Sequence, residues 1–279
     1  MRNLTVNDIE GMSYTDFISF IKETNRCPGG KDTIRKIVQN SFVDDKSRIL
    51  DVGSNTGFTT LELAHITRSR IDGIDISDAC VKTANDLLKS DTSFVKSRVK
   101  FQVGSAYEIP FNDEVFDLVV TGGATSFMDK KQKAVSEYLR VLKSWGFLSV
   151  TQLFYVNKPP QKVLDKVSNA IGVKIEPWGE EEWRNVFLNV QSNQKLELYY
   201  YESNKLSARS EKDIDEYIGY FINKPHLANL SNEVKEVISK KWKNYIDIFN
   251  ENHKYLGYFI ALFRKTKYPE EPELFIRKP

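Results

Sequence analysis

The feature that most constrains the fold is a short apolar run that passes directly into a glycine turn, Arg48-Ile-Leu-Asp-Val-Gly-Ser-Asn-Thr-Gly57. The apolar residues are typical of a strand covered on both faces, as in a parallel sheet. The turn, Gly53 to Gly57, carries little side-chain bulk and precedes an expected helix. Such a turn allows positive φ and close approach of a ligand, and the free N–H groups of the helix point toward it. The stretch predicts either a ligand-binding turn or a purely structural strand end.

A second apolar strand, Ile71-Asp-Gly-Ile-Asp-Ile76, ends in an acid at Asp75, 22 residues after Gly53. An acid about twenty residues beyond a glycine turn can accept hydrogen bonds from the two hydroxyls of a ribose. The alternative is a solvated Asp at a strand end, followed by Ser77 as a helix N-cap. The spacing favours a nucleoside-binding site.

The order of the turn, Asp51-Val-Gly53-Ser-Asn55-Thr-Gly57, differs from the Gly-x-Gly-x-x-Gly of dinucleotide-binding proteins. It resembles the motif of class I S-adenosylmethionine-dependent methyltransferases, an acid, a residue and then Gly-x-Gly-x-Gly. In this chain Asn55 occupies the position of the middle glycine of the motif. Asn is the residue other than glycine that best tolerates left-handed backbone, so we expect the turn to be kept.

A longer similarity follows, from Gly104 to Thr121 and from Glu137 to Val150. It resembles the small-molecule branch of these methyltransferases that includes the ubiquinone and menaquinone biosynthesis enzymes. The positions in register are Ala106, Pro110-Phe111, Phe116-Asp117 and Arg140-Val-Leu-Lys143. The resemblance spans about Ile49 to Val150, and it departs at Ser144-Trp145-Gly146, where the family usually has Pro-Gly-Gly.

The resemblance implies S-adenosylmethionine as cofactor and S-adenosylhomocysteine as product. In the family, the acid at Asp51 acts through the turn, and often through water, on the amino group of the methionine moiety. Ser105 and Ala106 are expected near adenine, and Gly122 beneath the sulfonium. The expected cofactor-binding residues are Arg26, Asp51, Gly53, Ser54, Asn55, Gly57, Asp75, Ile76, Ser105, Ala106, Thr121 and Gly122.

Arg26 lies in a loop broken by Pro28 and two glycines, before the turn. From there it could reach the methionine carboxylate, although a solvated Arg in a helix–helix connection explains it equally well. The two cysteines, Cys27 and Cys80, match no metal spacing. We expect no metal site and no disulfide, and we interpret Cys27 as a packed side chain rather than a nucleophile.

The chain has 40 basic and 38 acidic residues, and its net charge of +2 gives no reason to expect a nucleic-acid partner. It has no charged-then-apolar leader and no apolar run of about 18 residues. We therefore expect a cytoplasmic protein without a membrane span, as a monomer or homodimer.

The predicted fold is α/β: a Rossmann-like, doubly wound, seven-stranded sheet with an antiparallel last strand, N-terminal helices and a helical lid insertion. We expect residues 1–45 to form an N-terminal helical cap, residues 46–205 and 254–270 the methyltransferase core, and residues 206–253 the lid. The lid is predicted from the helical spacing of apolar residues in a segment where the family often has only a short turn. Within the core, Thr59 and Glu62 have capping-box spacing, and Lys130 to Lys143 reads as a helix.

Methyl transfer from a sulfonium is an in-line displacement, so the enzyme mainly orients the acceptor and excludes water. Aromatic faces can stabilise the cation. A general base is needed for a hydroxyl or an acidic carbon, and less for a free amine. The candidate substrate-contacting residues are Tyr14, Phe127, Tyr155, Trp178 and His226, and we name no catalytic residue.

The leading hypothesis is methyl transfer to a small organic acceptor, through an O, N or C nucleophile, bound between core and lid. Methylation of RNA or protein is an alternative that a positive face across the lid would favour. A nucleoside-binding regulator without catalysis is another, and an NAD oxidoreductase fits the glycine spacing least.

Overall fold

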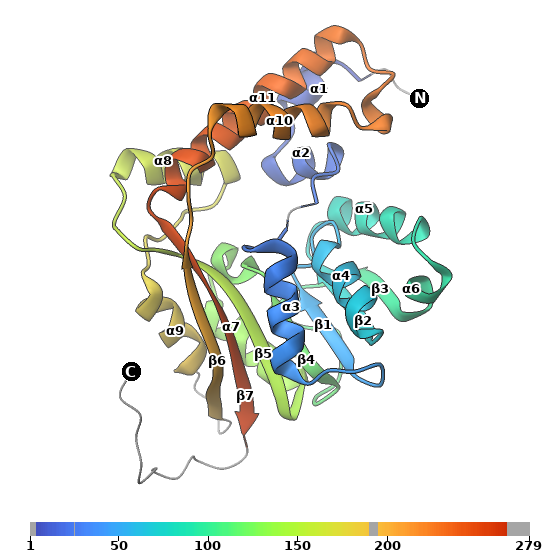
Figure 1. The fold of residues 1–279 in the computed structure, drawn as a ribbon, viewed down its shortest axis with the longest axis vertical. Helices are drawn as coiled ribbons and strands as arrows, with labels where there is room; N and C mark the ends of the chain where they lie inside the picture. Colours follow the sequence, from blue (N-terminus) through green and yellow to red (C-terminus); the bar gives the residue numbers. More distant parts are fainter. Residues whose placement is uncertain (1–3, 25, 190–194, 267–279) are drawn as a thin grey trace.

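The computed structural model describes residues 4–24, 26–189 and 195–266 of the 279-residue chain. At its centre is a seven-stranded sheet in the order β3-β2-β1-β4-β5-β7-β6 (Figure 1). The strands are β1 (Arg48–Val52), β2 (Arg70–Asp75), β3 (Val99–Val103), β4 (Phe116–Thr121), β5 (Leu142–Tyr155), β6 (Lys195–Lys205) and β7 (Leu256–Thr266). The first five run parallel, whereas β7 is antiparallel to both β5 and β6. The predicted sheet with an antiparallel last strand is confirmed.

Helices cover both faces of the sheet because successive side chains of each buried strand point to opposite sides. On β1, Ile49 belongs to one hydrophobic cluster and Leu50 to the other. The first cluster includes residues of α3 (Gly30–Ser41), α4 (Phe58–Thr67), α5 (Asp78–Lys89) and α6 (Ser93–Arg98). The second includes residues of α7 (Lys131–Val141) and α9 (Glu180–Leu188). Each helix presents one apolar stripe to the strands.

A third cluster lies beyond the carboxyl ends of the parallel strands, at the top of Figure 1. It joins α1 (Val6–Glu10) and α2 (Tyr14–Phe20) to α10 (Glu211–Ile222) and α11 (Asn232–His253). The short helix η2 (Pro225–Leu227) connects α10 and α11, and α8 (Gln161–Ile171) packs beside α11. We refer to α10, η2 and α11 as the lid.

The lid leaves and rejoins the sheet between two neighbouring strands. Lys205 at the end of β6 pairs with Gly257 at the start of β7, and Leu206 N donates to Leu256 O at 3.0 Å. Within residues 1–45, α1 and α2 pack on the lid, whereas α3 packs on the sheet. The division into residues 1–45, 46–205 with 254–270, and 206–253 stays a proposal; residues 267–270 lie outside the described part.

Two local predictions were wrong. Thr59 and Glu62 do not cap α4, which begins after Gly57 in left-handed backbone at φ 93° with no side-chain cap. The helix predicted to end at Lys143 ends at Val141, because Leu142 already adopts extended backbone and pairs with Phe116 of β4. Helix α6 had no counterpart in the sequence prediction.

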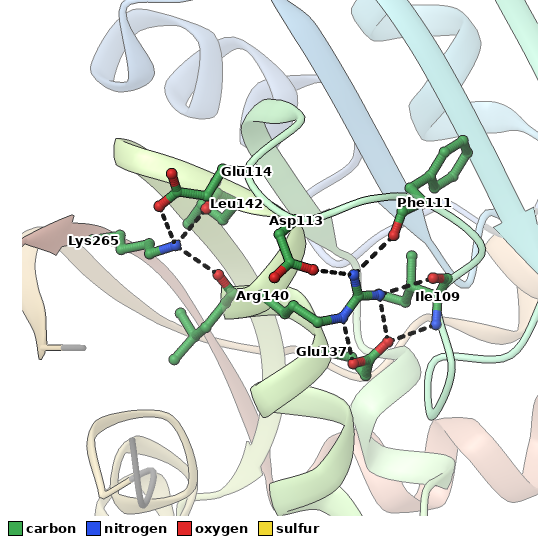
Figure 2. A network of polar contacts seen from close by, with 9 residues as sticks. Ile109, Phe111, Asp113, Glu114, Glu137, Arg140, Leu142 and Lys265 are labelled. Atoms are coloured by element: carbon green, nitrogen blue, oxygen red, sulfur yellow. Dashed lines mark hydrogen bonds and ion pairs between the residues drawn. The ribbon is translucent and has the colours of Figure 1, made fainter. Parts of the chain in front are cut away.

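Arg140 connects α7 to the loop that follows β3 (Figure 2). Its guanidinium donates to the carbonyls of Ile109 at 2.9 Å and Phe111 at 2.8 Å. The same group pairs with Glu137 at 2.7 Å and Asp113 at 2.8 Å. Glu137 in turn accepts from Ile109 N at 2.8 Å. These charge-assisted hydrogen bonds fix the loop from both its N–H and its C=O groups.

Lys265 of β7 also belongs to this network and contacts the C-terminal end of α7 (Figure 2). Its ammonium is almost fully buried and donates to Leu139 O at 2.9 Å and Leu142 O at 2.6 Å. These carbonyls lie where α7 ends, and a helix end leaves carbonyls without intrahelical partners. Lys265 therefore satisfies backbone oxygens that the helix-to-strand change frees.

Candidate active site

The turn after β1 is held in an unusual backbone conformation by three residues. Gly53 has φ 76°, Asn55 φ 48° and Gly57 φ 93°. Gly53 N and Ser54 N both donate to Ile74 O of β2, each at 2.9 Å. The side-chain oxygen of Asn55 accepts from Thr56 N at 2.8 Å. The expectation that Asn55 would keep the left-handed backbone of a glycine is confirmed.

Two glycines of the turn have no room for a side chain. A Cβ on Gly53 would lie 2.3 Å from Cβ of Ala124, in the helix η1 (Ala124–Phe127) after β4. A Cβ on Gly57 would lie 2.8 Å from the ring of Phe101. The turn is therefore pressed between the loop after β4 and the side chains of β3.

Asp51 lies beneath the turn and is 2% exposed. Its carboxylate accepts from the hydroxyl of Thr60 on α4 at 2.6 Å. Burial raises the pKa of Asp51 to about 6, with a further contribution from the charge of Asp75. This hydrogen bond links β1 to α4, the helix that follows the turn.

Asp75 faces the turn from the end of β2. Its two carboxylate oxygens accept from Asn55 N and Ser77 N, both at 2.9 Å. Ser77 is the N-cap of α5, as the alternative reading of this stretch had it. The carboxylate is nevertheless only partly exposed and oriented by two backbone N–H groups at the edge of the turn. Each oxygen keeps a second acceptor site that could receive a hydroxyl.

An apolar surface adjoins this carboxylate. Ile76 is 78% exposed and Val103, paired with Asp75 on the neighbouring strand, is 51% exposed. Ala106 packs on the core, and Ser105 Oγ accepts from Tyr107 N at 3.1 Å, which orders the loop beside them. A flat apolar ring could lie on this surface while its attached ribose meets Asp75.

The end of β4 lies against the N-terminal loop. Gly122 approaches Cys27, whose Cβ would be 3.2 Å from a Cβ at position 122. Burial raises the pKa of the Cys27 thiol to about 12, which agrees with a packed side chain. Thr121 is buried and lies 3.2 Å, oxygen to oxygen, from the hydroxyl of Thr125. Arg26 is exposed, with its guanidinium 5.1 Å from the ring centre of Phe58 at the start of α4.

The structure brings two predicted substrate residues to one helix of the lid. The ring of Tyr14 packs edge-on against Tyr245 and Phe249 of α11, with ring centres 5.2 Å and 5.5 Å away. Tyr155 OH bonds to Asn252, also on α11, at 3.1 Å. Burial raises the pKa of Tyr14 well above its usual value, and the charge of Glu23 adds to this effect.

The side chains of the other predicted substrate residues make different contacts. Trp178 O accepts from Tyr155 N at 2.9 Å, while the ring of Trp178 packs edge-on against Trp183, with ring centres 4.9 Å apart, in the cluster of α7 and α9. Phe127 is 53% exposed on η1. His226 Nε2 lies 3.0 Å from Phe20 O, and burial lowers the pKa of this imidazole. That contact fastens η2 to α2.

Sequence reasoning missed Glu23, a buried acid between the turn and the lid. Thr56 Oγ1 donates to the carbonyl of Glu23 at 2.9 Å, and Tyr217 OH donates to its carboxylate at 2.8 Å. Nothing in the local pattern Lys22-Glu-Thr24 distinguishes it from a solvated charge. Its importance depends on two partners that are 33 and 194 residues away in the chain.

The residues around the turn fit S-adenosylmethionine. A partly exposed acid lies beside an exposed apolar surface, and the buried Oγ of Ser54 has no hydrogen-bond partner within the described residues. In that same part of the chain no group of three or more His, Cys, Asp or Glu could hold a metal. No described helix is both long and apolar enough to cross a bilayer.

Comparison with known proteins agrees with this geometry. Residues 50–150 match the family described as a methyltransferase domain. Together with the sheet order and the turn, this match confirms that the chain carries the domain of a class I S-adenosylmethionine-dependent methyltransferase, an enzyme class whose cofactor is S-adenosylmethionine.

Among curated proteins, the chain resembles the ubiquinone/menaquinone biosynthesis C-methyltransferase UbiE of Azotobacter vinelandii, at 29% identity over 145 residues, 51% of this chain and 55% of that protein. It is 30% identical to ajmaline N-methyltransferase of Rauvolfia serpentina over 148 residues, 49% of this chain and 50% of that protein. The chain thus spans about half the length of these relatives. Among solved structures, the MccD protein superposes with a TM-score of 0.72 at 25% identity, over 87% of this chain and all of that one.

Proposed function

We propose that this protein transfers the methyl group of S-adenosylmethionine to a small organic acceptor held between the core and the lid. The observation that carries the cofactor part is Asp75, a carboxylate oriented by Asn55 N and Ser77 N beside the exposed Ile76. The acceptor part is supported by Tyr155 at the end of β5 and Tyr14 on α2, which both contact α11 of the lid.

The chain's own residues would hold the cofactor at both ends. Asp75 would accept from the ribose hydroxyls, Ile76 would support adenine, and Ser54 Oγ would find a polar partner. Arg26 would pair with the methionine carboxylate. When bound, the cofactor supplies an electrophilic methyl group that an acceptor atom attacks in line.

The acceptor atom is open to carbon, nitrogen or oxygen. The relatives' names include both a C-methyltransferase and an N-methyltransferase, so they do not favour one. His226 is engaged with Phe20 O, and we assign it no role as a general base. We also propose that the protein is a cytoplasmic monomer or homodimer. We propose no nucleic-acid partner, because the net charge is only +2.

Calorimetric titration of the purified protein with S-adenosylmethionine and S-adenosylhomocysteine tests the proposal. We expect binding that Asp75→Ala weakens at least about tenfold, because a charged acceptor of two hydroxyls is lost. Asp78→Ala, three residues on and exposed, is the matched control and should leave affinity unchanged. Circular dichroism confirms that both variants fold.

Folded protein that binds neither compound would overturn the proposal, and so would equal affinities for the two variants. If binding is found, transfer of radiolabelled methyl to panels of small amines, phenols and acidic carbon compounds identifies the acceptor class. Transfer to RNA or protein alone would replace the small-molecule proposal, and binding without any transfer would favour a regulator.

A further inference from the structure

One residue, Glu23, makes contacts in two directions from the segment after α2. Its backbone carbonyl accepts the hydroxyl of Thr56 at 2.9 Å, and Thr56 is 1% exposed inside the glycine turn. Its carboxylate accepts the hydroxyl of Tyr217 on α10 at 2.8 Å. Glu23 is itself buried, at 7% exposure. A single residue therefore connects the cofactor turn to the lid.

Neighbouring contacts strengthen this connection. Lys224 donates to the carbonyl of Lys22, and His226 Nε2 lies 3.0 Å from Phe20 O. The side chains of α1, α2, α10 and α11 share one hydrophobic cluster, so these helices pack as one unit. Displacement of the segment from Phe20 to Glu23 would therefore be passed on to the lid.

Hydrogen bonds of this kind respond strongly to geometry. A hydroxyl that donates to a buried carboxylate contributes more than a neutral pair, and it weakens steeply when distance or angle changes. The side-chain bond to Tyr217 and the backbone bond to Thr56 are made by the same residue. The position of the turn and the position of α10 cannot change independently while both bonds hold.

We propose that Glu23 is a positioning residue that couples cofactor binding at the turn to docking of α10. Ser54 and Asn55 would hold the cofactor, and this would order the turn and so strengthen the bond from Thr56 to the carbonyl of Glu23. The carboxylate of Glu23 would then be held more firmly in place for Tyr217, so that α10 docks more tightly when the cofactor is bound. By linkage, docking of α10 strengthens cofactor binding by the same factor. The inference rests on the proposed function.

Tyr217→Phe tests the coupling, with Tyr220→Phe as control. Both changes remove one hydroxyl from α10, but Tyr220 is 68% exposed. The probe is S-adenosylhomocysteine, and the measurements are its Kd and the amide hydrogen exchange of residues 211–222 with and without it. In the unaltered protein we expect the probe to slow exchange across α10. Tyr217→Phe should weaken probe binding about tenfold and abolish the probe-dependent slowing, whereas Tyr220→Phe should change neither.

Substitution of Glu23 separates the hydrogen bond from the charge. Glu23→Gln keeps a side-chain oxygen that accepts from Tyr217, and should retain most of the probe-dependent slowing. Glu23→Ala removes the acceptor and should behave like Tyr217→Phe. If Glu23 had a purely structural role, Glu23→Ala would instead raise amide hydrogen exchange of residues 211–222 equally with and without the probe.

The outcomes distinguish the two proposals. If the unaltered protein binds S-adenosylhomocysteine but Tyr217→Phe and Tyr220→Phe behave alike, the coupling is overturned and the proposed function stands. Probe-dependent slowing that survives Glu23→Ala overturns it as well. If the folded, unaltered protein does not bind the probe, both proposals fail.

Discussion

At the scale of single residues, the turn shows how far local chemistry predicts structure. Asn55 is expected in left-handed backbone because Asn tolerates that conformation best after glycine, and it has φ 48°, with its side-chain oxygen accepting from Thr56 N. Glu23 could not be predicted, because its role comes from Thr56 and Tyr217, which only the folded chain brings to it. A few neighbouring residues are enough to predict local backbone conformation, but they do not indicate which distant residues will become partners.

Asn55→Gly and Asn55→Ala should have different effects. Glycine adopts the left-handed backbone without strain, so we expect Asn55→Gly to keep affinity for S-adenosylhomocysteine. Alanine loses both the local hydrogen bond and this tolerance, which costs about 1 kcal/mol or more in the free energy of unfolding. Urea unfolding and calorimetry measure the two effects. Equal stability of the two variants would contradict the argument.

At the scale of elements, strands and helices with a clear period were predicted, but the junction between α7 and β5 was not. The apolar run of β4 and the amphipathic face of α7 are visible in sequence, but the change from α7 to β5 at Leu142 depends on pairing with Phe116. Lys265, distant in sequence, satisfies the carbonyls freed there. Tertiary contacts fix where an element stops, so single-sequence reasoning misplaces its boundary.

Arg140→Lys tests whether the element junction depends on the guanidinium. A lysine cannot bond Ile109 O, Phe111 O and Glu137 together, since it lacks the planar fork. We expect the free energy of unfolding to fall by about 2 kcal/mol. Hydrogen exchange in residues 105–112 should rise. Arg70→Lys, at an exposed position on β2, is the control. Unchanged exchange in the loop would show that other contacts hold it.

At the scale of the whole molecule, the fold class and the identity of the cofactor were predictable because they rest on a motif of fixed spacing. The residues that contact the acceptor stay a proposal. Tyr14 and Tyr155 contact α11, whereas the ring of Trp178 packs in the cluster of α7 and α9 and His226 contacts Phe20 O of α2. Aromatic and histidine residues pack in cores for many reasons, and their sequence alone does not indicate which face they join.

The buried Asp51 makes global stability depend on pH. Its pKa of about 6 in the folded chain exceeds the usual value for Asp, so its favourable contribution is fully present below about pH 4 and is lost as pH rises through about 6. Relative to Asp51→Asn, the unaltered protein should lose on the order of 3 kcal/mol between pH 4 and pH 7.5. Urea unfolding of both proteins at the two pH values measures the difference. A pH-independent difference would refute the raised pKa.

The lid departs from the sheet and returns to it at one point, where Leu206 N meets Leu256 O. Because the two ends are already joined there, the chain between them can lengthen, shorten or be exchanged without shifting the register of β6 and β7. The methyltransferase match at residues 50–150 lies entirely before this point. Under the proposed function, exchange of this insertion would change acceptor choice in evolution, while the methyl-donor half would stay under its own separate constraints.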